Sequence, residues 1–131
     1  MRKYAVLCGA FAAAVCVMAM PARAADVKSE IMTAEQHATL AAQAQSIDMV
    51  HMHLHHVLNC LVGPKGTDYD AQELDPCKNT GSGAIPDTTD AATKQKLKTA
   101  VAKAKGGLQE SNLAAAQKDA ADAAMTLDTA K

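Results

Sequence analysis

The chain has 131 residues, a length typical of one domain. Its formal net charge is −1, only 2% of its residues are aromatic, and it has no tryptophan. Such a chain has no basic excess to neutralise phosphates and few rings on which bases can stack. We therefore do not expect it to bind nucleic acid.

The first 24 residues have the pattern of an export signal. Arg2 and Lys3 precede an apolar stretch over residues 5–20, and Ala22-Arg23-Ala24 forms an A-x-A cleavage site. The apolar stretch is shorter than the roughly 20 residues that span a membrane comfortably. An uncleaved anchor and lipidation at Cys16 are the alternatives. The sequence predicts a periplasmic protein of Gram-negative type, with one domain over residues 25–131 and no membrane attachment after cleavage.

Cleavage leaves a chain with ten lysines, no arginine, 14 acidic residues and two cysteines. In an exported protein the pair Cys60 and Cys77 is expected to form a disulfide. In the loop-entropy view, a closed loop of about 17 residues stabilises the fold by ~3 kcal/mol. A pair of metal-binding or redox-active thiols is the alternative, but no C-x-x-C motif is present.

The first periodic segment predicts a helix over residues 33–61. Thr33 and Gln36 fit a capping box at its start, and Gly63-Pro64 ends it. Apolar residues recur every seven positions along it, at Leu40, Ile47, Leu54 and Leu61. A long connection over residues 63–87 follows, rich in glycine, proline and acidic residues. We interpret it as a solvated loop, since it lacks the full ligand pattern of a calcium loop.

Two further helices are expected, over residues 89–105 and 111–129. Residues 87–89 offer caps for the first, and Gly106-Gly107 is expected to break it. Their apolar stripes are rich in alanine, which permits close helix packing. The sequence therefore predicts an all-α fold: an antiparallel three- to four-helix bundle with one long disulfide-pinned loop. A fourth helix would come from residues 26–32 or from the loop.

The functional signal lies in residues 48–60, which read DMVHMHLHHVLNC. His51 and His55 are four residues apart, so on a helix both imidazoles leave the same face and can bind one cation. In one continuous helix, Asp48 and His37 lie on the same flank, and either of them or a water molecule could complete that site.

A second band of the same helix carries Met49, His53 and His56. It mixes thioether and imidazole ligands. Thioether favours Cu(I), and imidazole suits copper, zinc and nickel, so the mixture favours copper over zinc or nickel. The alternatives are a pH-sensitive histidine face in a stress or interaction module without metal, and ordinary packing.

Catalytic motifs are missing from the sequence. Met52 follows His51 where a zinc protease would have glutamate, and no nucleophile–histidine–acid pattern or phosphate-binding loop stands out. We expect a binding protein and not an enzyme.

The histidine-bearing, alanine-rich helix behind an export signal resembles the small periplasmic metal-binding helical proteins of Gram-negative bacteria. The resemblance covers residues 33–61 and implies metal sequestration, carriage or resistance. Those proteins often repeat histidine along several helices, whereas the later helices here have none, which favours one or two sites. The chain is also similar in size to periplasmic four-helix cytochromes with non-covalent haem, but it has few bulky residues to enclose a porphyrin. A homodimer along the first helix, or a protein partner at the acidic loop, is a further expectation.

Overall fold

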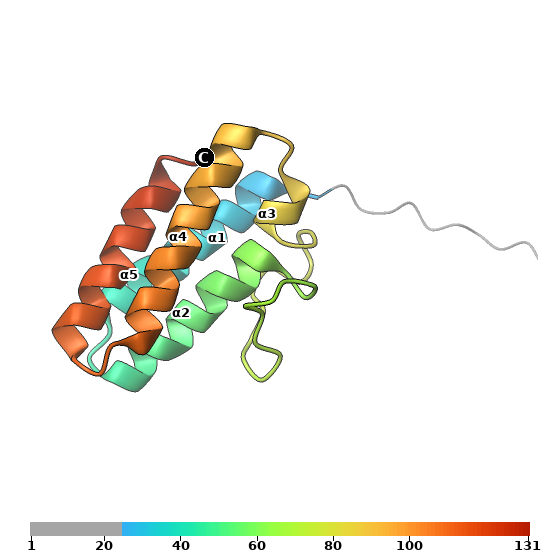
Figure 1. The fold of residues 1–131 in the computed structure, drawn as a ribbon. Coiled ribbons are helices and arrows are strands. Elements are labelled where there is room, and N and C mark those ends of the chain that lie inside the picture. Colours follow the sequence, from blue (N-terminus) through green and yellow to red (C-terminus); the bar gives the residue numbers. More distant parts are fainter. Residues whose placement is uncertain (1–24) are drawn as a thin grey trace, which may run out of the picture.

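The computed structural model describes residues 25–131, so the expected export signal lies outside the described residues. In this part of the chain four long helices lie side by side, and the expected helical bundle is confirmed (Figure 1). The helices are α1 (Val27–Gln43), α2 (Ile47–Val62), the one-turn α3 (Ala84–Asp87), α4 (Ala91–Gln109) and α5 (Leu113–Asp128). None of them is long and apolar enough to cross a membrane.

The four long helices form a closed ring. α1 packs against α2 and α5, and α4 packs against the same two helices from the other side. Contacts between their ends show that neighbours are antiparallel. The end of α4 meets the start of α2, where His51 contacts Glu110, and the start of α5 meets the end of α1, where Gln117 donates to the Ala44 carbonyl. This is an up-down-up-down bundle.

The expected single helix over residues 33–61 is wrong, because the chain reverses at residues 44–46 and forms two helices. Ala44 has an extended backbone, and the Ser46 hydroxyl caps α2 by accepting from the Met49 amide at 3.3 Å. α1 also begins earlier than expected, at Val27, with Asp26 accepting from Ser29 as its N-cap. Leu40, Ile47 and Leu54 keep the seven-residue spacing across the turn, although α1 and α2 are separate helices.

The core is built mainly of small side chains. Leu54 from α2, Leu97 from α4 and Leu127 from α5 are fully buried. Between them lie alanines whose size lets the helices approach closely: Ala34, Ala38, Ala41, Ala100, Ala104, Ala116, Ala120 and Ala123. The leucine expected in the inner stripe of the first helix, Leu40, is instead 40% exposed, because α1 presents its alanine face to the core.

The expected break at Gly106-Gly107 is also wrong. α4 continues through both glycines to Gln109. Gly107 is buried, and a Cβ there would lie 2.6 Å from the Leu54 Cδ1 atom. This glycine therefore serves close packing of α4 against α2. The expected third helix is confirmed as α5, with Asn112 as its cap, while the α4 cap is Asp90.

The connection between α2 and α4 contains turns and the short helix α3, and it lies outside the ring (Figure 1). The expected Cys60–Cys77 disulfide is present and ties the middle of this connection to α2. Near its start, Gly63 adopts a φ of +66° and packs against the Ser82 carbonyl, where a Cβ would clash. The two ends of the loop are thereby held together beside the end of α2.

Candidate metal centre

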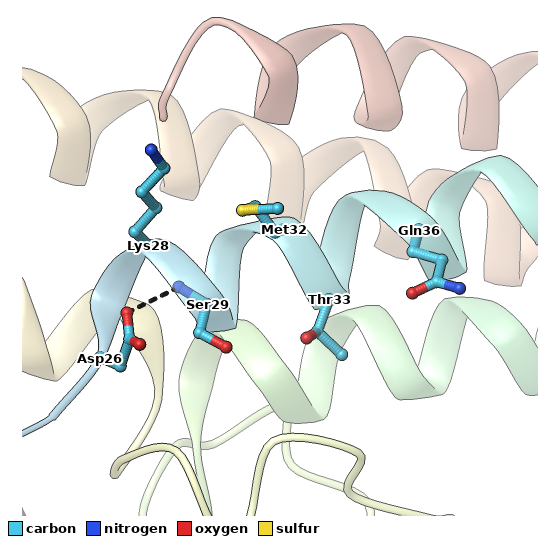
Figure 2. A pocket seen from close by; sticks show the side chains of 6 residues that line it. All are labelled: Asp26, Lys28, Ser29, Met32, Thr33 and Gln36. Carbon is cyan, nitrogen blue, oxygen red and sulfur yellow. Dashed lines mark hydrogen bonds between the residues drawn. The ribbon is translucent and has the colours of Figure 1, made fainter.

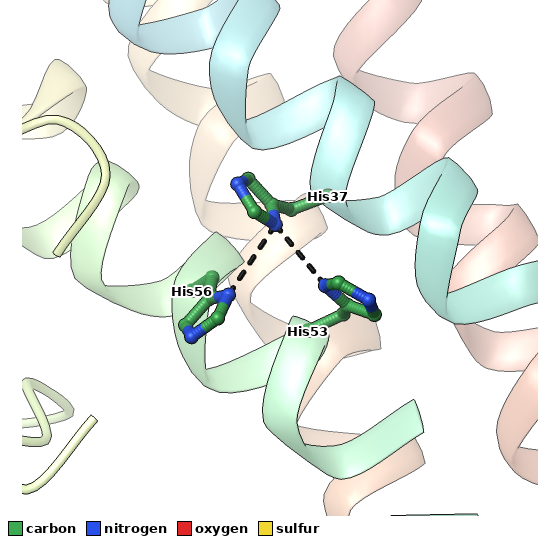
Figure 3. A group of neighbouring side chains, drawn as sticks. All are labelled: His37, His53 and His56. Carbon is green, nitrogen blue, oxygen red and sulfur yellow. Dashed lines mark hydrogen bonds between the residues drawn. The ribbon is translucent and has the colours of Figure 1, made fainter. Parts of the chain in front are cut away.

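Three histidine rings face one another between α1 and α2 (Figure 3). His37 comes from α1, and His53 and His56 come from successive turns of α2. The His37 Nδ1 atom lies 3.2 Å from Nδ1 of His53 and 3.3 Å from Nδ1 of His56. The ring centroids lie 4.9 to 5.7 Å apart. His56 is buried, and the other two rings are partly buried.

The reversal of the chain at residues 44–46 makes this grouping. It folds α1 back along α2, so that His37 lies opposite His53 and His56. On α2 the latter two are three residues apart and therefore leave the same face. All three residues of the cluster lie on regular helices.

Two of the three nitrogen separations match those of a metal site. Zinc–imidazole bonds of about 2.0–2.1 Å in tetrahedral geometry place the ligand nitrogens about 3.3 Å apart. The two separations that involve the His37 Nδ1 atom, 3.2 and 3.3 Å, have this length. With three protein ligands, one coordination position stays open for water or a fourth ligand.

Hydrogen bonds among the three rings alone fit the same arrangement poorly. A neutral imidazole carries one N–H and one lone pair, so the single Nδ1 of His37 must serve both neighbouring rings. A cation at the centre would instead accept one lone pair from each of the three rings. The donor set thus fits a metal ion better than it fits a purely hydrogen-bonded cluster.

The surroundings keep these rings neutral. Burial, reinforced by the nearby His56 and His53 rings, lowers the pKa of His37 to about 4. Burial likewise lowers the pKa of His53. Burial is the main cause that lowers the pKa of His56, with a contribution from His53 and partial opposition by the Glu73 carboxylate. Since a ligating imidazole must be neutral, all three lone pairs are available near pH 7.

The histidines that the sequence analysis paired lie elsewhere. The His51 Nε2 atom is 3.0 Å from the Glu110 carbonyl oxygen, at the end of α4. The His55 Nδ1 atom is 3.3 Å from the Asp70 carboxylate, at an angle that does not make a hydrogen bond. The structure does not bring these two rings into the three-histidine group, and their role as ligands stays a prediction.

Of the predicted second band, His53 and His56 do come together, and His37 joins them. A single continuous helix would place His37 on the flank of His51, whereas the turn at residues 44–46 puts it opposite His53 and His56. Met49 is 46% exposed and lies one helical turn before His53 on α2. Its place on this face agrees with the predicted band, and its binding of metal stays a prediction.

A second group of close ligand atoms occurs in the described residues, formed by Cys60, Asp75 and Cys77. Both sulfurs are joined in the disulfide, so neither is a thiolate. This group is therefore structural in the oxidised protein.

A surface hollow of about 430 Å³ lies at the start of α1, and no histidine or cysteine lines it (Figure 2). It is lined by the outer side chains of one helix, among them Lys28, Met32 and Gln36. Its one carboxylate, Asp26, is engaged as the N-cap of α1. The three-histidine group remains the strongest candidate site in residues 25–131.

Comparison of the chain with known protein families, with curated proteins and with solved structures finds no match.

Proposed function

We propose that the protein binds one transition-metal ion through His37, His53 and His56. The observation that carries the proposal is that the Nδ1 atom of His37 lies 3.2 Å from that of His53 and 3.3 Å from that of His56. The lowered pKa values of the three rings support it, because they leave the ligands neutral at pH 7.

Copper is the proposed ion, with zinc and nickel as the alternatives. Imidazole serves all three metals, and the thioether of Met49 one turn away favours Cu(I). With an export signal at its N-terminus, the protein would act in the periplasm in metal sequestration, carriage or resistance. A single site formed by three ligands suits carriage or buffering of individual ions.

The alternative of a pH-sensitive histidine module is less well supported at this cluster. A switch between pH 5 and 8 needs a histidine whose pKa lies in that range. The pKa of His37 is about 4, below that range. The haem alternative has no observation in its favour.

The test is a titration of the purified, oxidised protein with Cu(I), Cu(II), Zn(II) and Ni(II) in turn, followed by stoichiometry and melting temperature. A ligand that binds only the native state stabilises it by RT ln(1 + L/Kd), where L is the free metal concentration, so the melting temperature rises with the logarithm of that concentration once it exceeds the Kd. We expect one ion per chain, with copper giving the largest increase.

Two variants locate the site. His37→Ala should weaken binding at least tenfold, whereas the matched control His51→Ala should bind as the wild-type protein does. Weakening by His51→Ala with no effect of His37→Ala would instead favour the pair His51 and His55. The absence of binding at micromolar metal and pH 7.5 would overturn the proposed function. Replacing Met49 with leucine should lower the affinity for Cu(I) more than that for Zn(II).

A further inference from the structure

The acidic loop after α2 returns to the helix and is fixed there by one buried side chain. Asn59 is 1% exposed and lies one turn after His56 on α2. Its amide nitrogen donates to the carbonyls of Asp70 at 2.9 Å and Leu74 at 3.2 Å. Its amide oxygen accepts from the Asp70 N–H at 2.8 Å. A single asparagine thus holds both ends of the segment 70–74.

This anchoring brings a carboxylate to the metal centre. Glu73 lies between the two anchored positions, and its Oε2 atom is 3.7 Å from Nε2 of His56. The opposite nitrogen of that ring, Nδ1, faces His37. His56 therefore has the candidate metal position on one side and a carboxylate on the other.

Such a carboxylate has a defined role beside a metal-bound histidine. It accepts the N–H of the nitrogen that does not bind the metal, which fixes the tautomer and ring orientation and makes the ligating nitrogen more basic. The separation of 3.7 Å is longer than a hydrogen bond of about 2.7–3.2 Å. The Glu73 side chain is 36% exposed, so a small rotation is available to shorten it.

We propose that Glu73 is a positioning residue for the metal site, and that Asn59 holds it in place. The proposal rests on the proposed metal-binding function and goes beyond it by assigning a residue outside the ligand set. Glu73 keeps the proton of His56 on Nε2, so that the Nδ1 lone pair points at the centre of the three rings.

The neighbouring carboxylate supplies a matched control. Asp70 is in the same loop, carries the same charge, and faces His55 instead of a ring of the three-histidine group. Asp70→Asn keeps the side-chain oxygen that accepts from the Gln72 amide, so the local turn is preserved. A general electrostatic effect of the loop on a cation would be lost equally in both variants. A specific effect would be lost only in Glu73→Gln.

The first measurement is the metal affinity of the wild-type protein, Glu73→Gln and Asp70→Asn, with the best-bound ion of the titration. We expect Glu73→Gln to lower the affinity 10- to 100-fold at unchanged stoichiometry. Asp70→Asn should stay within about threefold of the wild type. Glu73→Asp, whose carboxylate is one methylene shorter, should lose a similar amount to Glu73→Gln.

The second measurement needs no metal. Nitrogen-15 NMR of the histidine side chains in the metal-free protein should show His56 with its proton on Nε2, and Glu73→Gln should give a mixture of tautomers. If the wild type binds metal and Glu73→Gln matches Asp70→Asn in affinity, the inference is overturned and the metal function stands. If the wild type binds no metal, both are overturned.

Discussion

The Nδ1 atoms of His37 and His53 lie 3.2 Å apart although the residues are separated by sixteen positions in the sequence. In one continuous helix this spacing would place them about 24 Å apart along the axis, at a rise of about 1.5 Å per residue. They meet because the chain reverses at residues 44–46. The candidate metal centre is therefore a product of the turn between α1 and α2 as much as of the histidines.

The short segment that makes this turn carries weak sequence signals. It has no glycine or proline, and Leu40, Ile47 and Leu54 stay in heptad register across it. The signals that predict a helix start at this point are Ser46 as a cap and Asp48 in the first turn. Such residues also occur inside helices, so these two signals alone do not distinguish a turn from a continuous helix.

The buried glycine of α4 gives the first prediction. Gly107→Ala would place a methyl group 2.6 Å from Cδ1 of Leu54, which is fully buried. Overpacking of this kind costs about 1–3 kcal/mol, and it exceeds the gain of up to ~1 kcal/mol in helix propensity. Gly107→Ala should therefore lower the free energy of unfolding, measured in urea.

The neighbouring glycine is the matched control. At Gly106 a new Cβ would approach only the Asp119 carboxylate, at 3.1 Å, and that side chain can move away. Gly106→Ala should be neutral or stabilise the protein by up to ~1 kcal/mol. Equal effects of the two substitutions would contradict the packing role given to Gly107.

Features set by local sequence could be predicted, whereas features set by the helix that lies opposite could not. The last two helices followed from apolar stripes, since the buried Leu97 and Leu127 lie on expected inner faces. The disulfide followed from the predicted export signal and the cysteine count. The use of Gly107 inside a helix, and the pairing of His37 with α2, could not be predicted because each depends on which helix lies opposite.

The disulfide gives the second prediction. Cys60 and Cys77 are separated by 17 positions, and in the loop-entropy view their bond stabilises the fold by about 3 kcal/mol. The double variant Cys60→Ala, Cys77→Ala should lose about this amount in urea unfolding. Because the bond also holds the loop that carries Glu73, the variant should bind metal more weakly. Unchanged metal affinity would show that Asn59 suffices to hold that segment.

The pH dependence of the metal-free protein gives the third prediction. The pKa of His37 is about 4 in the folded state, against about 6.5 when unfolded. Well above pH 6.5 both states are neutral at this ring, and its titration does not change the stability. As the pH falls from 6.5 to 4, the unfolded chain takes up a proton that the folded chain does not, so the folded state loses stability.

The check is urea unfolding at several pH values between 4 and 8, with chelator present. His37→Asn should make the decrease below pH 6.5 shallower, whatever its effect at pH 8. If the free energy of unfolding changed with pH in the same way in the variant and the wild type, the decrease below pH 6.5 could not be assigned to His37.

A buried carboxyl group gives the fourth prediction. Its effect on stability opposes that of His37, because it makes the folded state more stable as the pH falls. Glu30 on α1 is fully buried, and its Oε1 atom accepts from the Gly83 amide at 3.0 Å, while its Oε2 atom has no hydrogen-bond partner. Burial raises its pKa to about 7, with further contributions from the nearby carboxylates of Asp87, Asp75 and Asp26. The group is thus hard to ionise in the folded protein.

The direction in which Glu30 changes the stability with pH follows from the difference between its pKa values in the folded and unfolded chain. As the pH rises from about 4.5 to 7, the unfolded chain loses this proton first, so stability falls and the loss is complete above pH 7. Glu30→Gln removes the titration and keeps an oxygen that can accept from Gly83. The variant should therefore gain in free energy of unfolding, relative to the wild type, between pH 4.5 and pH 8. A difference that stays constant across this range would show that Glu30 ionises as easily in the folded chain as in the unfolded one.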